Sequence, residues 1–233
     1  METAELIQLI KTRRSIHSFQ DKPVPEAVLV QAVETATWAP NGGNSQNWHF
    51  LIITDKKVIN VIADTIQASL KTMSSWQEMA NAGPPPGTDS LRRAPALIVV
   101  TTVRPSRPAD NVIGERIGTD AKSKRPFVEL QEGAIEKRAH TDPKAKQIYE
   151  GLKYIAGWVQ STSAAVAYLM LVLHQMGLGS VWMTGPLHAK IEIEKTLKLP
   201  SGLDIVTLVP VGYPAENPTK NRKPVSEVCE VIK

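Results

Sequence analysis

Three polar clusters that lie far apart in the sequence contain the residue types from which a binding site could be built. Residues 13–17 (RRSIH) bring two guanidinium groups, a hydroxyl and an imidazole, and residues 220–223 (KNRK) bring a second set of donors. Guanidinium forks match phosphate oxygens bidentately, so two basic clusters of this kind suit a phosphate group. Residues 41–47 (NGGNSQN) offer amides that both donate and accept, which suits the edge of a heteroaromatic ring. Each cluster taken singly is also consistent with a solvated helix end or loop.

Other kinds of site find little support. The sequence contains no GxxxxGK[ST] phosphate loop, no GxGxxG between a strand and a helix, and no GxSxG turn, which disfavours an ATPase, a Rossmann dehydrogenase and a hydrolase. No two of the five histidines are three or four residues apart, and Cys229 is the only cysteine, so we expect no metal site. His174 falls in a predicted core helix and is interpreted as structural. Cys229 is interpreted as a small packing residue.

The elements that must position these clusters alternate between helix and strand. Helices are predicted from Thr3 to about Arg13, from Pro25 to before Pro40, from Asp55 to Met73, and at 155–176 and 189–197. Strands are predicted at 50–54, 95–103, 180–183 and 205–211, with a strand-like end at 228–232. This alternation, without an internal repeat, predicts a single domain over residues 1–233, of class α/β or α+β with one sheet.

Two long segments depart from the ordinary pattern. Residues 155–176 are apolar on several faces, which predicts a helix that is buried on all sides. Residues 104–153 are charged and poor in apolar periodicity, so they form either a helical lid over a site or an exposed excursion, and we favour the lid.

Composition narrows the partners. The formal net charge of +4 over 233 residues is too mild for a nucleic-acid-binding protein, which carries a dense basic stripe. No apolar run approaches the roughly 20 residues of a membrane span, and no signal peptide opens the chain. The single cysteine fits a reducing compartment. We therefore expect a cytoplasmic protein that contacts neither nucleic acid nor membrane.

The order of the motifs resembles one family. Residues 13–19 (RRSIHSF) resemble the RRSxRxF opening of the nitroreductase family of FMN-dependent flavoproteins, and residues 39–50 (APNGGNSQNWHF) resemble its second motif, a proline followed by NxQPW. Residues 177–180 (GLGS), 184–185 (TG), 211–214 (VGYP) and 220–224 (KNRKP) resemble its closing motifs. One such motif is weak evidence, but the ordered set covers nearly the whole chain and is highly specific.

The resemblance implies an α+β fold, with a mixed sheet flanked by helices, in an intertwined homodimer that buries helix 155–176 and exchanges its C-terminal strands. It also implies FMN at the dimer interface. Carried over residue by residue, the phosphate would be held by Arg13, Ser15, Lys220 and Arg222, with Arg14 close by. His17 would lie at the N1–C2=O edge, and Thr184 and Gly185 along the flavin near N5. The partner chain would contribute Pro40, Asn41, Gly42 and Asn44.

Two positions depart from the family pattern. His17 stands where the family usually has Arg or Lys, which changes the charge expected at the flavin edge. Asn47 stands where the family usually has Pro, which is expected to loosen the loop that precedes the strand.

The activity that the resemblance implies is transfer of hydride from NAD(P)H through FMN to a small planar acceptor, a nitroaromatic or a quinone, with ping-pong kinetics. The cofactor carries this chemistry, so no side chain is nominated as a catalytic acid or base. Two alternatives remain. One is a specialised family member, such as a reductive dehalogenase or an enzyme that modifies its own flavin. The other is a flavin-binding carrier or sensor without turnover.

Overall fold

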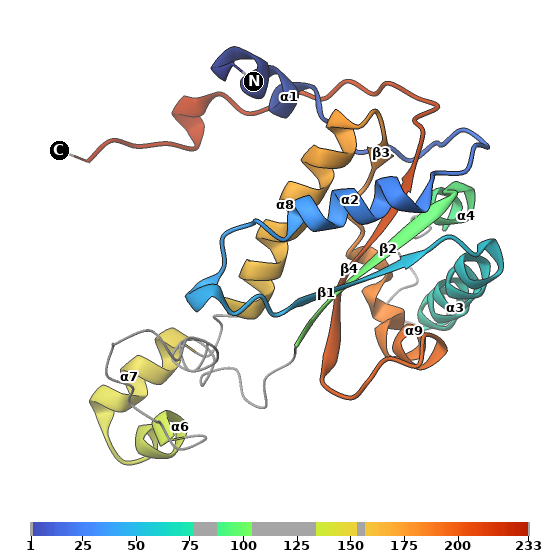
Figure 1. Ribbon diagram of the computed structural model, residues 1–233. Coiled ribbons are helices and arrows are strands. Elements are labelled where there is room, and N and C mark those ends of the chain that lie inside the picture. Colours follow the sequence, from blue (N-terminus) through green and yellow to red (C-terminus); the bar gives the residue numbers. More distant parts are fainter. Residues whose placement is uncertain (1, 77–87, 104–133, 153–156, 233) are drawn as a thin grey trace.

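The computed structural model describes residues 2–76, 88–103, 134–152 and 157–232 (Figure 1). Four strands form one sheet in the order β1-β2-β4-β3. They are β1 (Trp48–Ile53), β2 (Ala96–Val103), β3 (Gly179–Ser180) and β4 (Leu203–Gly212). Every pair is antiparallel. Helices and a sheet of this kind confirm the α+β class. The mixed character that we expected reduces, within the described residues, to an isolated parallel bridge between Ser15 and Ser180.

Helices cover both faces of the sheet. One face carries α2 (Glu26–Ala36) and α8 (Gly157–Gln175), and the other carries α3 (Lys56–Ser74), α4 (Asp89–Arg93) and α9 (Lys190–Thr196) (Figure 1). The remaining described helices are α1 (Thr3–Thr12), α6 (Ala134–Ala139), α7 (Pro143–Leu152) and the short 3₁₀ turns η1 (Gly42–Asn44), η4 (Gly185–Ala189) and η5 (Val225–Glu227). The three layers leave β2 and β4 buried on both sides.

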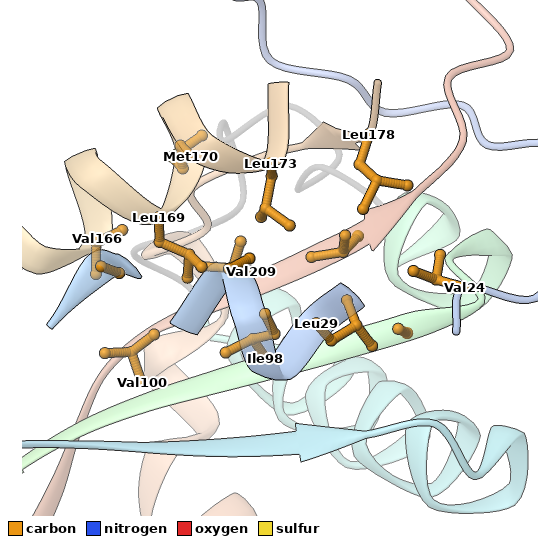
Figure 2. Close-up of a cluster of buried hydrophobic side chains, with 14 residues drawn as sticks. Val24, Leu29, Ile98, Val100, Val166, Leu169, Met170, Leu173, Leu178 and Val209 are labelled. Carbon is orange, nitrogen blue, oxygen red and sulfur yellow. The ribbon is translucent and has the colours of Figure 1, made fainter. Parts of the chain in front are cut away.

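Side-chain alternation along β2 divides the core into two halves. Ile98 and Val100 point toward α2 and α8, where they meet Leu29, Leu169 and Leu173 (Figure 2). Leu97 and Val99 point the other way, into the cluster under α3 and α9. A strand buried on both faces reads as a continuous apolar run, as residues 96–100 do. Strand β1 lies at the sheet edge and is only half-buried, so our expectation of a buried strand at 50–54 was wrong.

Helix boundaries follow the expected signals with one exception. The Asp55 carboxylate caps α3 by accepting from the Lys57 backbone N–H at 2.8 Å, as predicted. Gly177 ends α8 at φ +76°, the left-handed conformation that glycine adopts readily. Helix α1 begins one residue earlier than the expected Thr3 cap, because Glu2 and Glu5 form a reciprocal capping box.

The two ends of the chain leave much apolar surface exposed. Helix α1 buries none of its residues, and the outer face of α8 exposes Tyr168. The tail after β4 forms no strand, contrary to the prediction at 228–232, and Ile232 is 94% exposed. Cys229 is also exposed, so our packing interpretation was wrong for the single chain. Helix α8 is buried mainly on its sheet side, and among the described residues no element covers the outer face at Tyr168.

The predicted lid at 104–153 lies largely outside the described residues. Its described part, 134–152, contains α6 and α7, which pack against each other. Within the described chain, no helix combines the length and the apolar character that crossing a membrane requires.

Candidate functional site

The stretch from Ser15 to Gln20 is joined by backbone pairing to the ends of β3 and β4. The Ile16 N–H donates to the Ser180 carbonyl at 3.1 Å, and the Gln20 N–H donates to the Tyr213 carbonyl at 2.9 Å. In the opposite direction, the Ala215 N–H, in the chain after β4, donates to the Ser18 carbonyl at 2.9 Å. This pairing holds the first polar cluster beside the start of the C-terminal tail.

Two glycines make this close approach possible. A Cβ on Gly179 would lie 2.8 Å from Ile16, and a Cβ on Gly212 would lie 2.9 Å from the Phe19 ring and 2.6 Å from the Pro95 ring. Carbon atoms that are not bonded to each other do not approach so closely, so a larger residue at either position would push these segments apart. The GLGS and VGYP motifs therefore have a packing reason in this chain.

The carboxylate of Glu216 stabilises the same pairing of residues 15–20 with the chain after β4. Its carboxylate accepts from the backbone N–H groups of both His17 and Ser18, the latter at 2.9 Å. The His17 N–H has the largest effect and lowers the pKa of Glu216 below its usual range; the Ser18 N–H acts in the same direction, while partial burial opposes both. Sequence reasoning missed Glu216, although its place just after a closing motif is a usable signal.

Three guanidinium groups converge near this junction. Burial lowers the pKa of Arg13 below its usual range, and the nearby positive charges of Arg222 and Arg14 lower it further. Arg13 Nη1 is buried and has no hydrogen-bond partner among the described residues. Arg14 Nη1 is partly satisfied by the Lys11 and Arg13 carbonyls at 2.6 and 2.8 Å. Mutually repelling cations with an unmet buried donor are the arrangement expected of an anion site.

The other predicted phosphate ligands lie close in sequence to this cluster. Ser15 is exposed just after Arg14, and Lys220 is exposed on the tail two residues before Arg222. His174, which we had interpreted as purely structural, also faces the cluster. Burial lowers the pKa of His174, and the charges of Arg13 and Arg14 lower it further. Its Nε2 lies 3.1 Å from Thr12 Oγ1. The sequence shows no sign of this proximity, because 162 residues separate the pair.

A cavity of about 410 Å³ lies beside the stretch from Ser15 to Gln20, and His17 of that stretch lines it. His17, Thr184 and Gly185, which the resemblance assigned to the flavin, all line it. Most of its remaining wall is apolar and comes from α3, α4 and the chain after β3: Ile66, Leu70, Met73, Leu91, Val181, Trp182, Met183 and Pro186. Its volume falls in the range typical of small-molecule sites, about 300–1,000 Å³.

Within one chain, the amide-rich loop at residues 41–47 lies far from the arginine cluster formed by Arg13, Arg14 and Arg222. The Gly42 N–H donates to Ser161 Oγ at 3.2 Å, so the loop sits against the first turns of α8. The arginine cluster directly follows α1, which lies at the opposite end of α8 (Figure 1), and His174 lies near Arg13 and Arg14. Thirteen residues of helix separate Ser161 from His174, which is roughly 20 Å at 1.5 Å per residue. Pro40, Asn41, Gly42 and Asn44 therefore lie apart from the arginine cluster of their own chain, and none of the four lines the cavity.

The loop itself is well ordered by its amides. Asn41 Oδ1 accepts from the Gln46 N–H at 3.0 Å, and Asn41 Nδ2 donates to the Ala39 carbonyl at 3.2 Å. Asn47 Nδ2 donates to Thr102 Oγ1 at 3.0 Å, which ties the loop to β2. This hydrogen bond gives the loop an attachment to β2 at the position where the family usually has proline, and our expectation that Asn47 loosens the loop stays a prediction.

Comparison with known proteins defines the class of protein that this fold and site represent. The model of the nitroreductase family matches residues 10–213, and this chain belongs to that family.

Individual relatives agree with this assignment. An NADH dehydrogenase of Thermus thermophilus is 29% identical over 208 residues, covering 88% of this chain and 84% of the relative. The fold resembles that of a BluB-like flavoprotein from Clostridium difficile, with a TM-score of 0.72, 24% identity and full coverage of both chains. It also resembles an iodotyrosine deiodinase bound to FMN and 3-iodo-L-tyrosine, with a TM-score of 0.62, 25% identity, and coverage of 98% and 97% of the two chains.

We expect Glu216→Gln to lower the melting temperature at pH 7 by about 2–4 °C, the equivalent of about 1 kcal/mol for a domain of this size. The folded-state pKa of Glu216 lies below its unfolded value, so its contribution is present above the unfolded pKa and lost as pH falls through the folded one. The difference between variant and wild type should shrink as pH drops below about 4. Thermal melts across pH, with exposed Glu34→Gln as control, measure it; a pH-independent difference would contradict the charge interaction.

Proposed function

We propose that this chain is an FMN-dependent oxidoreductase that uses NAD(P)H to reduce small planar acceptors, nitroaromatics or quinones, by a ping-pong mechanism. The observation that carries the proposal is the buried, unpartnered Nη1 of Arg13 among Arg14 and Arg222, next to a cavity lined by His17 and Thr184. A phosphate at the arginines and a planar ring in the cavity would complete both features at once.

The donor set fits the phosphate of FMN. Its oxygens would accept from Arg13, Arg14 and Arg222, relieving the repulsion among them, with Ser15 and Lys220 within the same two segments. The His174 imidazole, whose pKa the two arginines lower, would gain an anionic neighbour. FMN supplies two-electron hydride chemistry when bound. The protein positions the ring, holds His17 at its edge and keeps water out with apolar walls.

We also propose that the site is completed by a second copy of the chain. The loop residues Pro40, Asn41, Gly42 and Asn44 lie roughly 20 Å along α8 from the arginine cluster, and none of them lines the cavity of their own chain, which supports their reaching the flavin of a partner. The exposed apolar residues of α1, the outer face of α8 and the tail give such a partner a surface to cover. Loop atoms Ser45 Oγ and Asn47 Oδ1, buried without partners among the described residues, mark the same end.

The cavity favours a reductase of neutral acceptors over a deiodinase. An amino acid such as iodotyrosine brings an ammonium and a carboxylate, which need charged or strongly polar partners when buried. Among the described residues that line the cavity there is no Asp, Glu, Lys or Arg. NAD(P)H and the acceptor would occupy this one cavity in turn, which is the structural reason for ping-pong kinetics. The cytoplasm is the location we propose, supported by the single, unpaired Cys229.

The purified yellow protein should bleach when mixed anaerobically with NADH or NADPH and should recover its colour on addition of a nitroaromatic or a quinone. Stopped-flow absorbance at the flavin bands measures both half-reactions. A protein that binds FMN but is not bleached by either nucleotide is a carrier or sensor, and the proposal fails. Turnover that consumes the flavin itself would identify a flavin-modifying enzyme instead.

Arg13→Ala and Arg222→Ala should each weaken FMN binding at least tenfold, about 1.4 kcal/mol, since each removes a charge-assisted hydrogen bond to the phosphate. Arg93→Ala, which removes an exposed guanidinium of α4, is the matched control and should leave affinity unchanged. Titration of the apoprotein with FMN, followed by quenching of flavin fluorescence, measures the constants. Equal affinities for all four proteins would remove these arginines from the site.

A further inference from the structure

The cavity contains one polar pair that neither the motifs nor the flavin contacts explain. His188 lies in η4, three residues after Gly185, and lines the cavity. Its Nδ1 lies 2.8 Å from Ser69 Oγ on α3. Within the described part of the chain, no hydrogen bond reaches His188 Nε2. The imidazole is thus held by one nitrogen while the other remains available.

The serine behaves unlike its neighbours on the same helix. Thr65, Thr72 and Ser74 each donate to the carbonyl four residues before them, the usual use of a hydroxyl within a helix. Ser69 makes no such bond among the described contacts and points its hydroxyl to His188 instead. A hydroxyl that donates to Nδ1 satisfies both groups and leaves the ring proton on Nε2. This assignment follows from the hydrogen-bond network.

The charge state of the ring follows from its surroundings. Burial among Leu70, Met73 and Leu91 lowers the pKa of His188 below its usual range, so the ring is neutral at pH 7. Among the described residues that line the cavity, the other polar side chains are the imidazole of His17 and the hydroxyl groups of Thr88 and Thr184. The residue therefore offers an uncharged N–H donor inside an apolar chamber.

We infer that His188, positioned by Ser69, is a specificity-determining residue that donates a hydrogen bond from Nε2 to a neutral acceptor oxygen of the substrate. The chemical class that fits is a planar aromatic whose reducible group presents a lone-pair oxygen without a charge, such as a quinone carbonyl or a nitro group. A carboxylate or sulfonate on the ring would be buried in the same cavity, where the described lining residues supply no Lys or Arg to pair with it, so such a substrate should bind less well. This inference rests on the proposed function, because it concerns the acceptor of that reaction.

Steady-state kinetics of the FMN-loaded protein with NAD(P)H test it through three acceptors. Naphthoquinone presents neutral carbonyl oxygens, and naphthoquinone sulfonate adds an anionic group. Ferricyanide is expected to accept electrons without binding in the cavity. His188→Leu should lower kcat/KM for naphthoquinone about five- to tenfold, mostly through KM, since one hydrogen bond is lost. His188→Gln keeps a donor and should stay within about twofold of wild type. Ferricyanide turnover measures the effect of each variant on NAD(P)H oxidation, and the loss attributed to His188 is the change in naphthoquinone turnover relative to ferricyanide turnover.

The serine has a matched control on its own helix. Ser69→Ala should lose part of the naphthoquinone preference over the sulfonate, whereas Ser74→Ala, whose hydroxyl bonds only to the Leu70 carbonyl, should lose none. Isotope-edited nitrogen NMR of histidine-labelled protein reads the tautomer directly. The His188 signals, assigned with His188→Gln, should show the proton on Nε2 in wild type and a mixture of tautomers in Ser69→Ala.

The outcomes separate this inference from the proposal on which it rests. A wild-type protein that reduces neither ferricyanide nor naphthoquinone would sink the proposed function. Normal ferricyanide turnover, with naphthoquinone kinetics unchanged in His188→Leu, or with the proton on Nδ1 in wild type, would overturn the role of His188 alone. Loss in His188→Leu with rescue in His188→Gln supports it.

Discussion

The pairing of residues 15–20 with the ends of β3 and β4 is the constraint on which the rest of the site depends. It places Arg13 and Arg14 at one side of the junction and His17 at the other, where the cavity opens. It also starts the C-terminal tail in the direction that brings Arg222 back to Arg13. Gly179 and Gly212 allow the approach, and Glu216 secures it with two backbone N–H groups. The positions of Arg13, Arg14, His17 and Arg222 thus follow from one short backbone pairing, parallel at Ser180 and antiparallel at Pro214, and from the charge of Glu216 that anchors it.

The single chain also leaves apolar surface exposed and keeps its amide-rich loop away from the arginines. Helix α8 is covered on the sheet side by Leu29 and the β2 side chains, whereas its outer face exposes Tyr168, and α1, which contacts α8, buries none of its own residues. The loop at Gly42 is bound to the far end of α8, away from the arginines. The proposed docking of a second copy along α8 would account for both observations, because it would bury the apolar faces and bring the loop to the cavity. Packing and function would then share one interface.

Much of the fold could be predicted from the sequence, because local signals decide it. Asp55 caps α3, Gly177 ends α8, and the uninterrupted apolar run of β2 marks a strand buried on both faces. The two basic clusters RRSIH and KNRK were recognisable from their residue types as candidates for holding a phosphate, and the structure brings Arg13, Arg14 and Arg222 near one another. What could not be predicted depends on distant contacts. His174 reaches the arginines through tertiary packing, Glu216 matters only because two backbone segments meet there, and the Ser69–His188 pair joins helices 119 residues apart. The exposed tail, Cys229 and the outer side of α8 differ from our expectations for the same reason: no described element of this chain covers them.

The central claim is that each functional site takes its phosphate clamp from one chain and its loop from the other, and a mixed dimer tests it most directly. One chain would carry Arg13→Ala with Arg222→Ala, and the other Gly42→Trp, a bulky change at an exposed position that would fill the partner's cavity. Each altered chain alone should bind little FMN. Co-expressed with different tags and purified as a mixed pair, they should recover half of the wild-type FMN content and NAD(P)H oxidation, because one site then combines an intact clamp with an intact loop. A mixed pair with no more FMN than either altered chain alone would contradict the account.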